Sequence, residues 1–446
     1  MALFNGKALN PGVRKREVFG WAMYDFANSG YTTVVLTAVF AAYFVGGVAG
    51  GAPWATLAWT AMLAFSSLLV MLTMPALGAH ADLRAAKKRL LAWCTVGCVA
   101  TTAALAGVGP GDVAWAVVAI VLSNLFYAWG ESLIAAFLPE LARPDSLGRV
   151  SGWGWSFGYF GGMLTLGLSL AYVLWAQGQG KPASQFVPVT MLITAVVYGL
   201  AATVTFALLK ERAVAQPQAR QDSGLRAALH RLTRTWQQAR HYPDFKALLA
   251  CALAYQAGIA VVIALAAVYA EQEMKFKQTD TMALIFLVNI AAAVGAFTWG
   301  YVQDRIGHRR ALGITLAGWI VMILLAVAAT GPALFWVSAV VAGLCMGSSQ
   351  SAGRALAGAF APVAQRAEFF GLWTFATRLS AIVGPLTYGL VTLMTAGNHR
   401  LAILSTGVFF VAGLWLLRRV DVDRGLAAAR AADTRHAGSA PGDGQA

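Results

Sequence analysis

Four ionisable side chains stand inside long apolar stretches of this sequence. They are the acids Asp25 and Glu131 and the bases Arg354 and Arg378. A charged group inside hydrocarbon is costly, so each of these side chains needs a partner or a task. An acid in such a place can take up and release a proton, and an acid and a base that face one cavity can hold the two ends of a zwitterion. These residue types predict a cavity that binds an ion or a small polar solute.

The first apolar stretch has a polar side. Asp25, Asn28, Ser29 and Thr32 fall on one face at helical spacing, and Tyr24 directly precedes Asp25. One hypothesis is a proton or cation site at a central cavity, formed by Tyr24, Asp25 and Asn28. The alternative is a structural carboxylate that is hydrogen-bonded within its own bundle of helices. The sequence leaves both hypotheses open.

Two later stretches are also polar along one face of the helix that each would form. Such faces suit a wall that contacts a polar solute, because side chains directed into lipid would have no hydrogen-bond partner. The polar side chains are Asn124, Tyr127 and Glu131 in the stretch 112–139, and Gln350 and Arg354 in the stretch 332–359.

Glu131 and Arg354 are 223 residues apart and carry opposite charges. This spacing is that of an internal repeat, so the two positions are equivalent in two halves of the chain. We hypothesise that the two side chains meet across a pseudo-twofold axis, as a gate or as ion-pair partners of a substrate. The alternative is that each reaches the membrane surface or pairs within its own half. Arg378 is then left to bind a substrate carboxylate or to neutralise Asp25.

Composition fixes the environment of these side chains. The 446 residues are 59% hydrophobic and only 12% charged, and the mean hydropathy is +0.64. A soluble domain has about 25% charged residues, so most of this surface faces lipid. Lipid cannot satisfy open strand edges, so the spanning elements must be helices of about 20 apolar residues. The sequence contains twelve such stretches, near 18–47, 54–80, 89–108, 112–139, 150–177, 186–210, 245–271, 279–303, 310–330, 332–359, 368–396 and 399–418.

The net charge of +14 is distributed unevenly between the loops. Lysine and arginine concentrate before the first stretch and in every second loop after it, and the intervening loops hold few. By the positive-inside rule both termini lie in the cytoplasm, and we expect a multi-pass protein of the bacterial inner membrane. The basicity therefore reflects topology, and no nucleic-acid partner is expected.

Three landmarks recur at nearly one offset, which indicates two six-helix halves. The pairs are Asp82 and Asp304, 222 residues apart, and Pro139 with Pro362 and Gly161 with Gly384, both 223 apart. The predicted organisation is a cytoplasmic N-terminus (1–17), a first bundle (18–210), a linker with an interfacial amphipathic helix (211–244), a second bundle (245–419) and a disordered cytoplasmic tail (420–446).

Two loops at equivalent positions share a pattern of glycine, aspartate and arginine. The second copy reads Gly-x-x-x-Asp-Arg-x-Gly-x-Arg-Arg over 300–310 and resembles the loop signature of the major facilitator superfamily. In the first copy, Leu83 and Ala85 depart from that signature. The glycines allow close helix approach, and the aspartates can cap a neighbouring helix or pair with arginines. The proposed gating residues are Gly78, Asp82, Arg84, Gly300, Asp304, Arg305, Arg309 and Arg310.

The segment Trp21-Ala-Met-Tyr24-Asp25-Phe-Ala27-Asn28-Ser29-Gly-Tyr31 resembles the first helix of the vacuole-effluxer-like branch of that superfamily. This branch includes fungal vacuolar amino-acid exporters. The resemblance implies an all-α fold of twelve transmembrane helices in two pseudo-symmetric bundles, and alternating access about a central site lined by the first, fourth, seventh and tenth helices. It also implies that the protein acts as a monomer.

The expected function is secondary active transport, as an exporter of an amino acid or similar zwitterion coupled to a proton gradient. Besides the lipid bilayer, the expected partners are the solute and protons. The sequence has no P-loop, no Gly-x-Ser-x-Gly and no His-Glu-x-x-His, so we expect neither an enzyme nor a cofactor, and no metal set completes around the cysteines. Two alternatives remain: an exporter of drugs or hydrophobic metabolites, and a non-transporting sensor on the same fold.

Overall fold

The computed structural model describes residues 6–213, 242–276, 278–396 and 398–438. Within these ranges, twelve helical segments are long and apolar enough to cross a membrane, and each overlaps one of the predicted stretches. The all-α class and the twelve spans are confirmed. The amphipathic helix predicted for the linker lies outside the described residues.

The N-terminal bundle contains the first six spans. Its first span is irregular, because π-helical turns at Thr32–Ala38 and Phe44–Val48 interrupt the α-helical ladder. Such turns are uncommon and often occur at functional sites. The helices of this bundle are α1 (Lys15–Tyr31), α2 (Phe40–Tyr43), α3 (Ala55–Leu83), α4 (Lys87–Ala104), α5 (Val113–Ala135), α6 (Leu138–Leu141), α7 (Leu147–Gly178) and α8 (Ala183–Leu208).

The C-terminal bundle contains the other six spans, one helix each. A further helix follows the last span at the C-terminal end of the described chain. The helices are α10 (Pro243–Glu273), α11 (Gln278–Ile306), α12 (His308–Ala328), α13 (Pro332–Phe360), α14 (Arg366–Met394), α15 (His399–Leu417) and α16 (Val422–Gly438).

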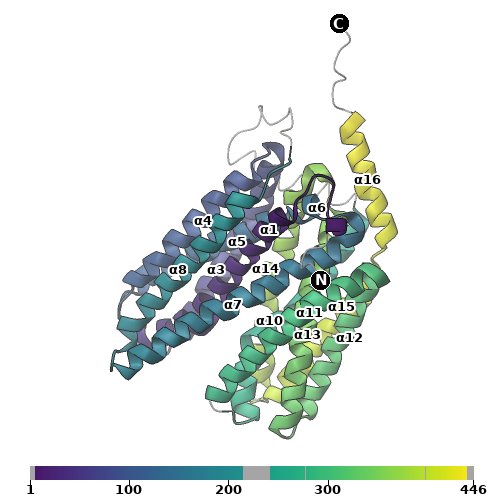
Figure 1. The fold of residues 1–446 in the computed structure, drawn as a ribbon. Helices are drawn as coiled ribbons and strands as arrows, with labels where there is room; N and C mark the ends of the chain where they lie inside the picture. The colour runs from purple at the N-terminus through teal and green to yellow at the C-terminus, as the bar shows by residue number, and fades with distance from the viewer. Residues whose placement is uncertain (1–5, 214–241, 277, 397, 439–446) are drawn as a thin grey trace.

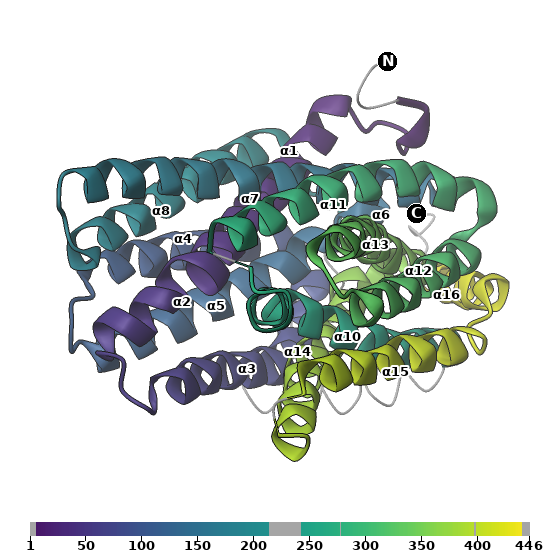
Figure 2. The same ribbon diagram turned by 90° about the horizontal axis from the view of Figure 1, so that it is seen from below.

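The two bundles come together at the end near α6 and α16 and diverge toward the other end (Figure 1). We call the first end the terminal face, because both described ends of the chain lie there. Two helix pairs form the seam between the bundles, α7 beside α11 and α3 beside α14 (Figure 2). Glycines allow the close approach: a Cβ on Gly78 would collide with the backbone of Ala367, and one on Gly152 with that of Ala296.

The internal repeat has a structural counterpart in helix packing. Gly161 of α7 lies against the backbone of Phe26 in α1, and Gly384 of α14 lies against the backbone of Ala257 in α10. Any side chain at either glycine would overlap the facing carbonyl group. The repeated glycines therefore allow close helix packing at equivalent positions in both bundles.

The prediction of a disordered tail after Arg419 is wrong for residues 422–438, which form α16. Gly425, Ala429 and Ala432 recur at i, i+4 and i+7 and are buried, with Gly425 against Phe360. This stripe of small residues has little intrinsic hydrophobicity, so the sequence alone does not reveal that it packs on the C-terminal bundle. Residues 439–446 lie outside the described part of the chain.

Polar contacts also hold α16 in place. Arg424 donates to both carboxylate oxygens of Asp244, over 2.6 and 2.7 Å. Asp433 accepts a 2.7 Å hydrogen bond from the backbone N–H of Val363, in the turn between α13 and α14. The helix thereby joins the terminal-face ends of α10, α13 and α14.

Candidate functional site

Asp25 and Arg354 form an ion pair across the seam. Asp25 lies on α1 and Arg354 on α13, and their Oδ2 and Nη1 atoms are 2.6 Å apart. Both side chains are buried, with 11% and 7% of their surface exposed. The Arg354 guanidinium also donates to the hydroxyl (3.1 Å) and the carbonyl (2.8 Å) of Ser151 on α7. One arginine of the C-terminal bundle thus holds two helices of the N-terminal bundle.

Aromatic rings surround this arginine. Its Cζ lies 4.8 Å from the centre of the Trp21 ring and 5.3 Å from that of Trp155. Gly154 leaves the space that the pair occupies, because a Cβ there would overlap both the Asp25 carboxylate and the Arg354 guanidinium. The rings exclude water and add cation–π attraction, which strengthens a charge pair in this position.

A second ion pair crosses the seam between Glu131 on α5 and Arg378 on α14. Their Oε2 and Nη2 atoms are 2.9 Å apart. The Glu131 side chain is 39% exposed and that of Arg378 is 15% exposed, so this pair is far more open than the first. The Tyr127 ring lies 5.5 Å from the Arg378 guanidinium and stacks on Tyr31.

The hypothesis that Glu131 meets Arg354 is therefore wrong in this conformation, and so is the pairing of Arg378 with Asp25. Each acid pairs with the other arginine: Asp25 with Arg354 and Glu131 with Arg378. An acid of the first half does meet a base of the second half, as expected, in both pairs. The partners differ because Arg354 packs against α7, where it also bonds Ser151, beside Asp25 of α1, whereas Glu131 of α5 lies beside α14.

The other polar residues of the first span lie inside the N-terminal bundle. Asn28 accepts a 2.8 Å hydrogen bond from the hydroxyl of Tyr198 on α8, and Tyr24 bonds Thr95 on α4 over 2.9 Å. Tyr24 is fully buried and Asn28 nearly so. These contacts tie α1 to α4 and α8, and in this conformation both residues are buried among the helices of their own bundle.

Asn124 and Gln350 also bond within their own bundles. Asn124 donates to the hydroxyl of Ser66 over 3.0 Å and joins α5 to α3. Gln350 accepts a 2.8 Å hydrogen bond from Gln256 and joins α13 to α10. Of the polar side chains predicted on these faces, Tyr127, Glu131 and Arg354 are the ones that take part in contacts around the two inter-bundle ion pairs.

Asp82 and Asp304 close the terminal face in equivalent ways. The Asp82 carboxylate accepts a 3.0 Å hydrogen bond from the backbone N–H of Glu368 at the start of α14. The Asp304 carboxylate accepts from the N–H groups of Gly148 (2.9 Å) and Arg149 (3.2 Å) at the start of α7, and from the Arg149 Nε at 2.8 Å. Each aspartate therefore caps a helix of the opposite bundle, as the loop signature predicts.

The remaining basic residues of the two loops face outward. Arg84, Arg305 and Arg310 are exposed, and Arg309 donates to the backbone carbonyl of Arg418 over 3.0 Å. Gly300 provides close packing instead, since a Cβ there would lie against the backbone of Gly148 and Arg149. The basic side chains thus lie on the terminal face, whereas the glycine and the aspartate form the seam.

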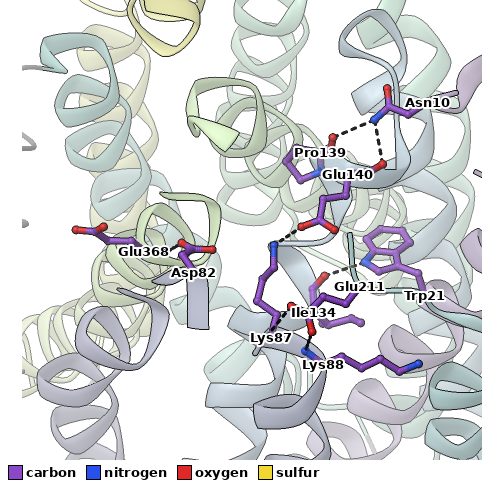
Figure 3. A network of polar contacts seen from close by, with 10 residues as sticks. All are labelled: Asn10, Trp21, Asp82, Lys87, Lys88, Ile134, Pro139, Glu140, Glu211 and Glu368. Atoms are coloured by element: carbon purple, nitrogen blue, oxygen red, sulfur yellow. Dashed lines mark hydrogen bonds and ion pairs between the residues drawn. The ribbon is translucent and has the colours of Figure 1, made fainter. Parts of the chain in front are cut away.

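A buried ion pair near the terminal face was not predicted from the sequence. Lys87, the first residue of α4, contacts Glu140 of α6, and both side chains are almost fully buried (Figure 3). Glu211 accepts hydrogen bonds from the N–H groups of Lys87 (2.8 Å) and Lys88 (2.9 Å) and so caps α4. Burial raises the pKa of the Glu211 carboxyl, and these N–H groups oppose the rise. The available signal was an acid beside Pro139 in an otherwise apolar segment.

Two six-helix bundles with repeated helix-capping aspartates and charge pairs across the seam define a transporter of the major facilitator class. In this class the bundles move relative to each other around a central site. Residues 55–430 match the family described as vacuole effluxer Atg22 like, and the chain belongs to this family. The protein is a multi-pass membrane transporter and not an enzyme.

Two relatives illustrate the family. The MFS-type transporter YxiO of Bacillus subtilis is 24% identical over 404 residues, which cover 89% of this chain and 93% of that protein. Autophagy-related protein 22-1 of Neosartorya fischeri is 28% identical over 210 residues. That match covers 44% of this chain and 34% of the fungal protein, so it extends over part of each.

Solved structures confirm the fold. The human organic anion transporter MFSD10 superposes with a TM-score of 0.72 at 16% identity, covering 90% of this chain and 99% of that one. The proton:xylose symporter XylE superposes with a TM-score of 0.69 at 15% identity, covering 94% and 97%. At such identities the likeness concerns the fold alone.

Proposed function

We propose that this protein is a monomeric secondary active transporter that exports a small zwitterion, with an amino acid as the leading candidate. Export proceeds across the bacterial inner membrane and is coupled to the proton gradient. The family membership supports transport, and the name "vacuole effluxer" supports export. The choice of a zwitterion rests on the ion pair between Glu131 and Arg378.

The Glu131–Arg378 pair has the chemistry of a zwitterion site. Its two charges are 2.9 Å apart, and the Glu131 side chain is 39% exposed. An amino acid can insert between them, with its ammonium on Glu131 and its carboxylate on Arg378. Each protein charge then exchanges one partner for another, so no charge is left unpaired during binding. The Tyr127 ring beside Arg378 provides an apolar wall.

We infer the orientation of the protein in the membrane from the charges of the terminal face. Arg84, Arg305 and Arg310 are exposed on it, which supports a cytoplasmic location under the positive-inside rule. The bundles meet on this side and diverge on the other (Figure 1), which supports an outward-facing conformation. The inward-facing conformation requires that the contacts of Asp82, Asp304 and Arg354 across the seam separate.

Asp25 is the candidate proton carrier. Protonation would remove its charge and weaken its bond to Arg354, which is one of the contacts that hold the bundles together. The hydrogen bonds of Arg354 to Ser151 cross the seam as well, so they also break when the bundles separate. The bond to Asp25 thus links the protonation state of α1 to the separation of the bundles, which is the requirement for coupling a proton gradient to alternating access.

The first test is the melting temperature of the purified protein against amino acids, other zwitterions, organic acids, sugars and hydrophobic drugs. A ligand at 100 times its dissociation constant adds about 2.7 kcal/mol of stability. We expect amino acids or similar zwitterions to stabilise the wild type and to lose this effect in Glu131→Gln and Arg378→Gln. The matched control is Glu273→Gln, which breaks a 2.9 Å ion pair with Arg400 inside the C-terminal bundle and should keep the response.

A response to drugs without any response to zwitterions would replace this proposal with the hydrophobic exporter. Flux in proteoliposomes then separates a transporter from a sensor. An acid-outside pH gradient should drive loss of the stabilising zwitterion from the cytoplasmic side in the wild type and not in Asp25→Asn. Binding without flux under any gradient would contradict the transport proposal.

A further inference from the structure

A groove opens between α7 and α11 on the outside of the seam. Its volume is about 320 Å³, and its lining is almost entirely apolar. The main side chains are Trp153, Phe157 and Phe160 from α7 and Ile290, Val294 and Phe297 from α11. The two walls belong to different bundles, so any molecule in this α7–α11 groove contacts both moving parts of the transporter.

The surroundings of the groove are hydrocarbon. Both walls lie inside membrane spans, and Phe160, Val294 and Ile290 remain about half exposed in the protein alone. A surface of this kind within the bilayer is covered by acyl chains. An indentation between two bundles can hold one chain more firmly than the smooth surface beside it, because the chain makes contacts on two sides.

A positively charged side chain, Arg149, lies at the terminal-face end of the groove. The Arg149 guanidinium lies 5.5 Å from the ring of Tyr301, whose hydroxyl accepts a 3.2 Å hydrogen bond from Trp153. Tyr301 also packs against Phe297. Arg149 and Trp153 are four residues apart on α7, which places them about 6 Å apart along the helix axis.

Arg149 has hydrogen-bonding capacity to spare. Its Nε donates to Asp304, and among the described residues its two terminal nitrogens have no hydrogen-bond partner. The side chain is 24% exposed. Exposed Arg305 is the next residue after Asp304 and adds positive charge at the same level. An oxyanion here would complete the arginine's hydrogen bonds and meet a local excess of positive charge.

We propose that the α7–α11 groove is a binding site for one anionic phospholipid. One acyl chain occupies the groove, and the phosphate of the headgroup binds the terminal nitrogens of Arg149. The lipid bridges the two bundles in the conformation described here, so bound lipid favours the closed terminal face. This site is separate from the Glu131–Arg378 pair and does not depend on the identity of the transported solute.

Native mass spectrometry of the purified full chain tests the site. Phosphatidylglycerol and phosphatidylcholine are added in turn, and the number and affinity of retained lipids are measured. Val294→Trp fills the groove and should lose the tightest phosphatidylglycerol. Val337→Trp is the matched control: Val337 of α13 is 51% exposed against 50% for Val294 and does not line the groove. It should retain the lipid.

Variants of Arg149 test whether its guanidinium binds the lipid headgroup. Arg149→Gln should weaken phosphatidylglycerol about tenfold, the effect of one lost charge-assisted contact, and reduce its preference over phosphatidylcholine. Arg149→Lys should keep most of that preference. Melting temperatures without added lipid establish that each variant is folded. Equal loss in both tryptophan variants, or equal affinity for the two lipids in the wild type, would show ordinary boundary lipid and overturn the proposal.

Discussion

Asp82 and Asp304 lie 222 residues apart in the sequence and cap the first turn of a helix in the opposite bundle, α14 and α7 respectively. Neither of these helices has a side-chain cap of its own: Gln365 and Ser146 stand at the N-cap positions without such a bond. The backbone N–H groups of each helix start are therefore satisfied across the seam. When the bundles separate at the terminal face, both helices lose an external acceptor.

Removing one of these caps should open the terminal face. A cap contributes about 1 kcal/mol, which corresponds to a roughly fivefold change in a two-state equilibrium. We expect Asp82→Ala to increase about fivefold the maleimide labelling of Ser351→Cys, a buried seam position. The measurement uses a chain whose native cysteines are replaced by alanine. Asp112→Ala, which removes a local cap on Gly109 at the opposite face, should leave the labelling unchanged.

The buried pair of Asp25 and Arg354 should show strong energetic coupling. Removing one partner leaves a buried charge and costs about 3–5 kcal/mol, whereas removing both leaves none. Asp25→Asn and Arg354→Gln should each destabilise the protein more than half as much as the double variant. Unfolding of the four proteins in detergent gives the coupling energy. The partly exposed pair of Glu273 and Arg400 should give less than about 1 kcal/mol in the same cycle. Strict additivity at Asp25 and Arg354 would contradict the observed contact.

Charge reversal distinguishes the observed pair from the one suggested by the repeat. Glu131→Arg and Arg378→Glu should each abolish transport, because each places two like charges 2.9 Å apart. The combination of both should restore part of the flux. Glu131→Arg combined with Arg354→Glu should stay inactive, and recovery in that combination would mean that the two residues meet in another conformation.

The repeated glycines should tolerate no side chain. At Gly161 a methyl group would overlap the backbone of Phe26, so Gly161→Ala should destabilise by about 1–3 kcal/mol or shift α7. Gly167 lies on the same helix, and a methyl group added there would meet no atom within 4 Å. Gly167→Ala should be neutral or stabilising by up to about 1 kcal/mol. Thermal unfolding of both variants in the same detergent compares them directly.

The terminal helix should protect the turn between α13 and α14. A chain ending at Asp421 loses the Asp433 acceptor for Val363 and both bonds from Arg424 to Asp244. We expect faster tryptic cleavage after Arg366 in this chain and in Asp433→Ala. Asp423→Ala, a change at an exposed position of the same helix, should be cleaved at the wild-type rate. Unchanged cleavage in the shortened chain would show that α16 does not shield the turn.

The spans could be predicted because hydrophobic length is a strong local signal, and the caps because the repeat aligns Asp82 with Asp304. The pairing of the charged side chains across the seam could not be predicted. Arg354 and Arg378 both face the seam, and which acid each meets depends on how far one bundle is shifted along the other. Sequence periodicity gives the face of a helix but not this shift.

The direction of the polar helix faces could not be predicted either. Tyr24 and Asn28 lie on the predicted face, yet that face is directed at α4 and α8. A polar stripe toward a cavity and a polar stripe toward a neighbouring helix have the same spacing. In the tail, the small residues Gly425, Ala429 and Ala432 recur at i, i+4 and i+7 and give only a weak apolar signal. They form a helix because a surface that includes Phe360 is available for packing.

In the ion pairs across the seam, each half of the chain supplies a particular charge. Inside the membrane the acid comes from the first half of the chain and the base from the second, and at the terminal face Arg149 and Asp304 reverse that order. Inside the membrane, two copies of the first half would leave Asp25 and Glu131 without the arginines, and two copies of the second half would leave Arg354 and Arg378 without the acids. The halves therefore select each other over themselves. A gene divided between the codons for Ala213 and Tyr242 should yield two fragments that assemble as one-to-one pairs in the membrane, with their register specified by charge rather than by the peptide that joins them.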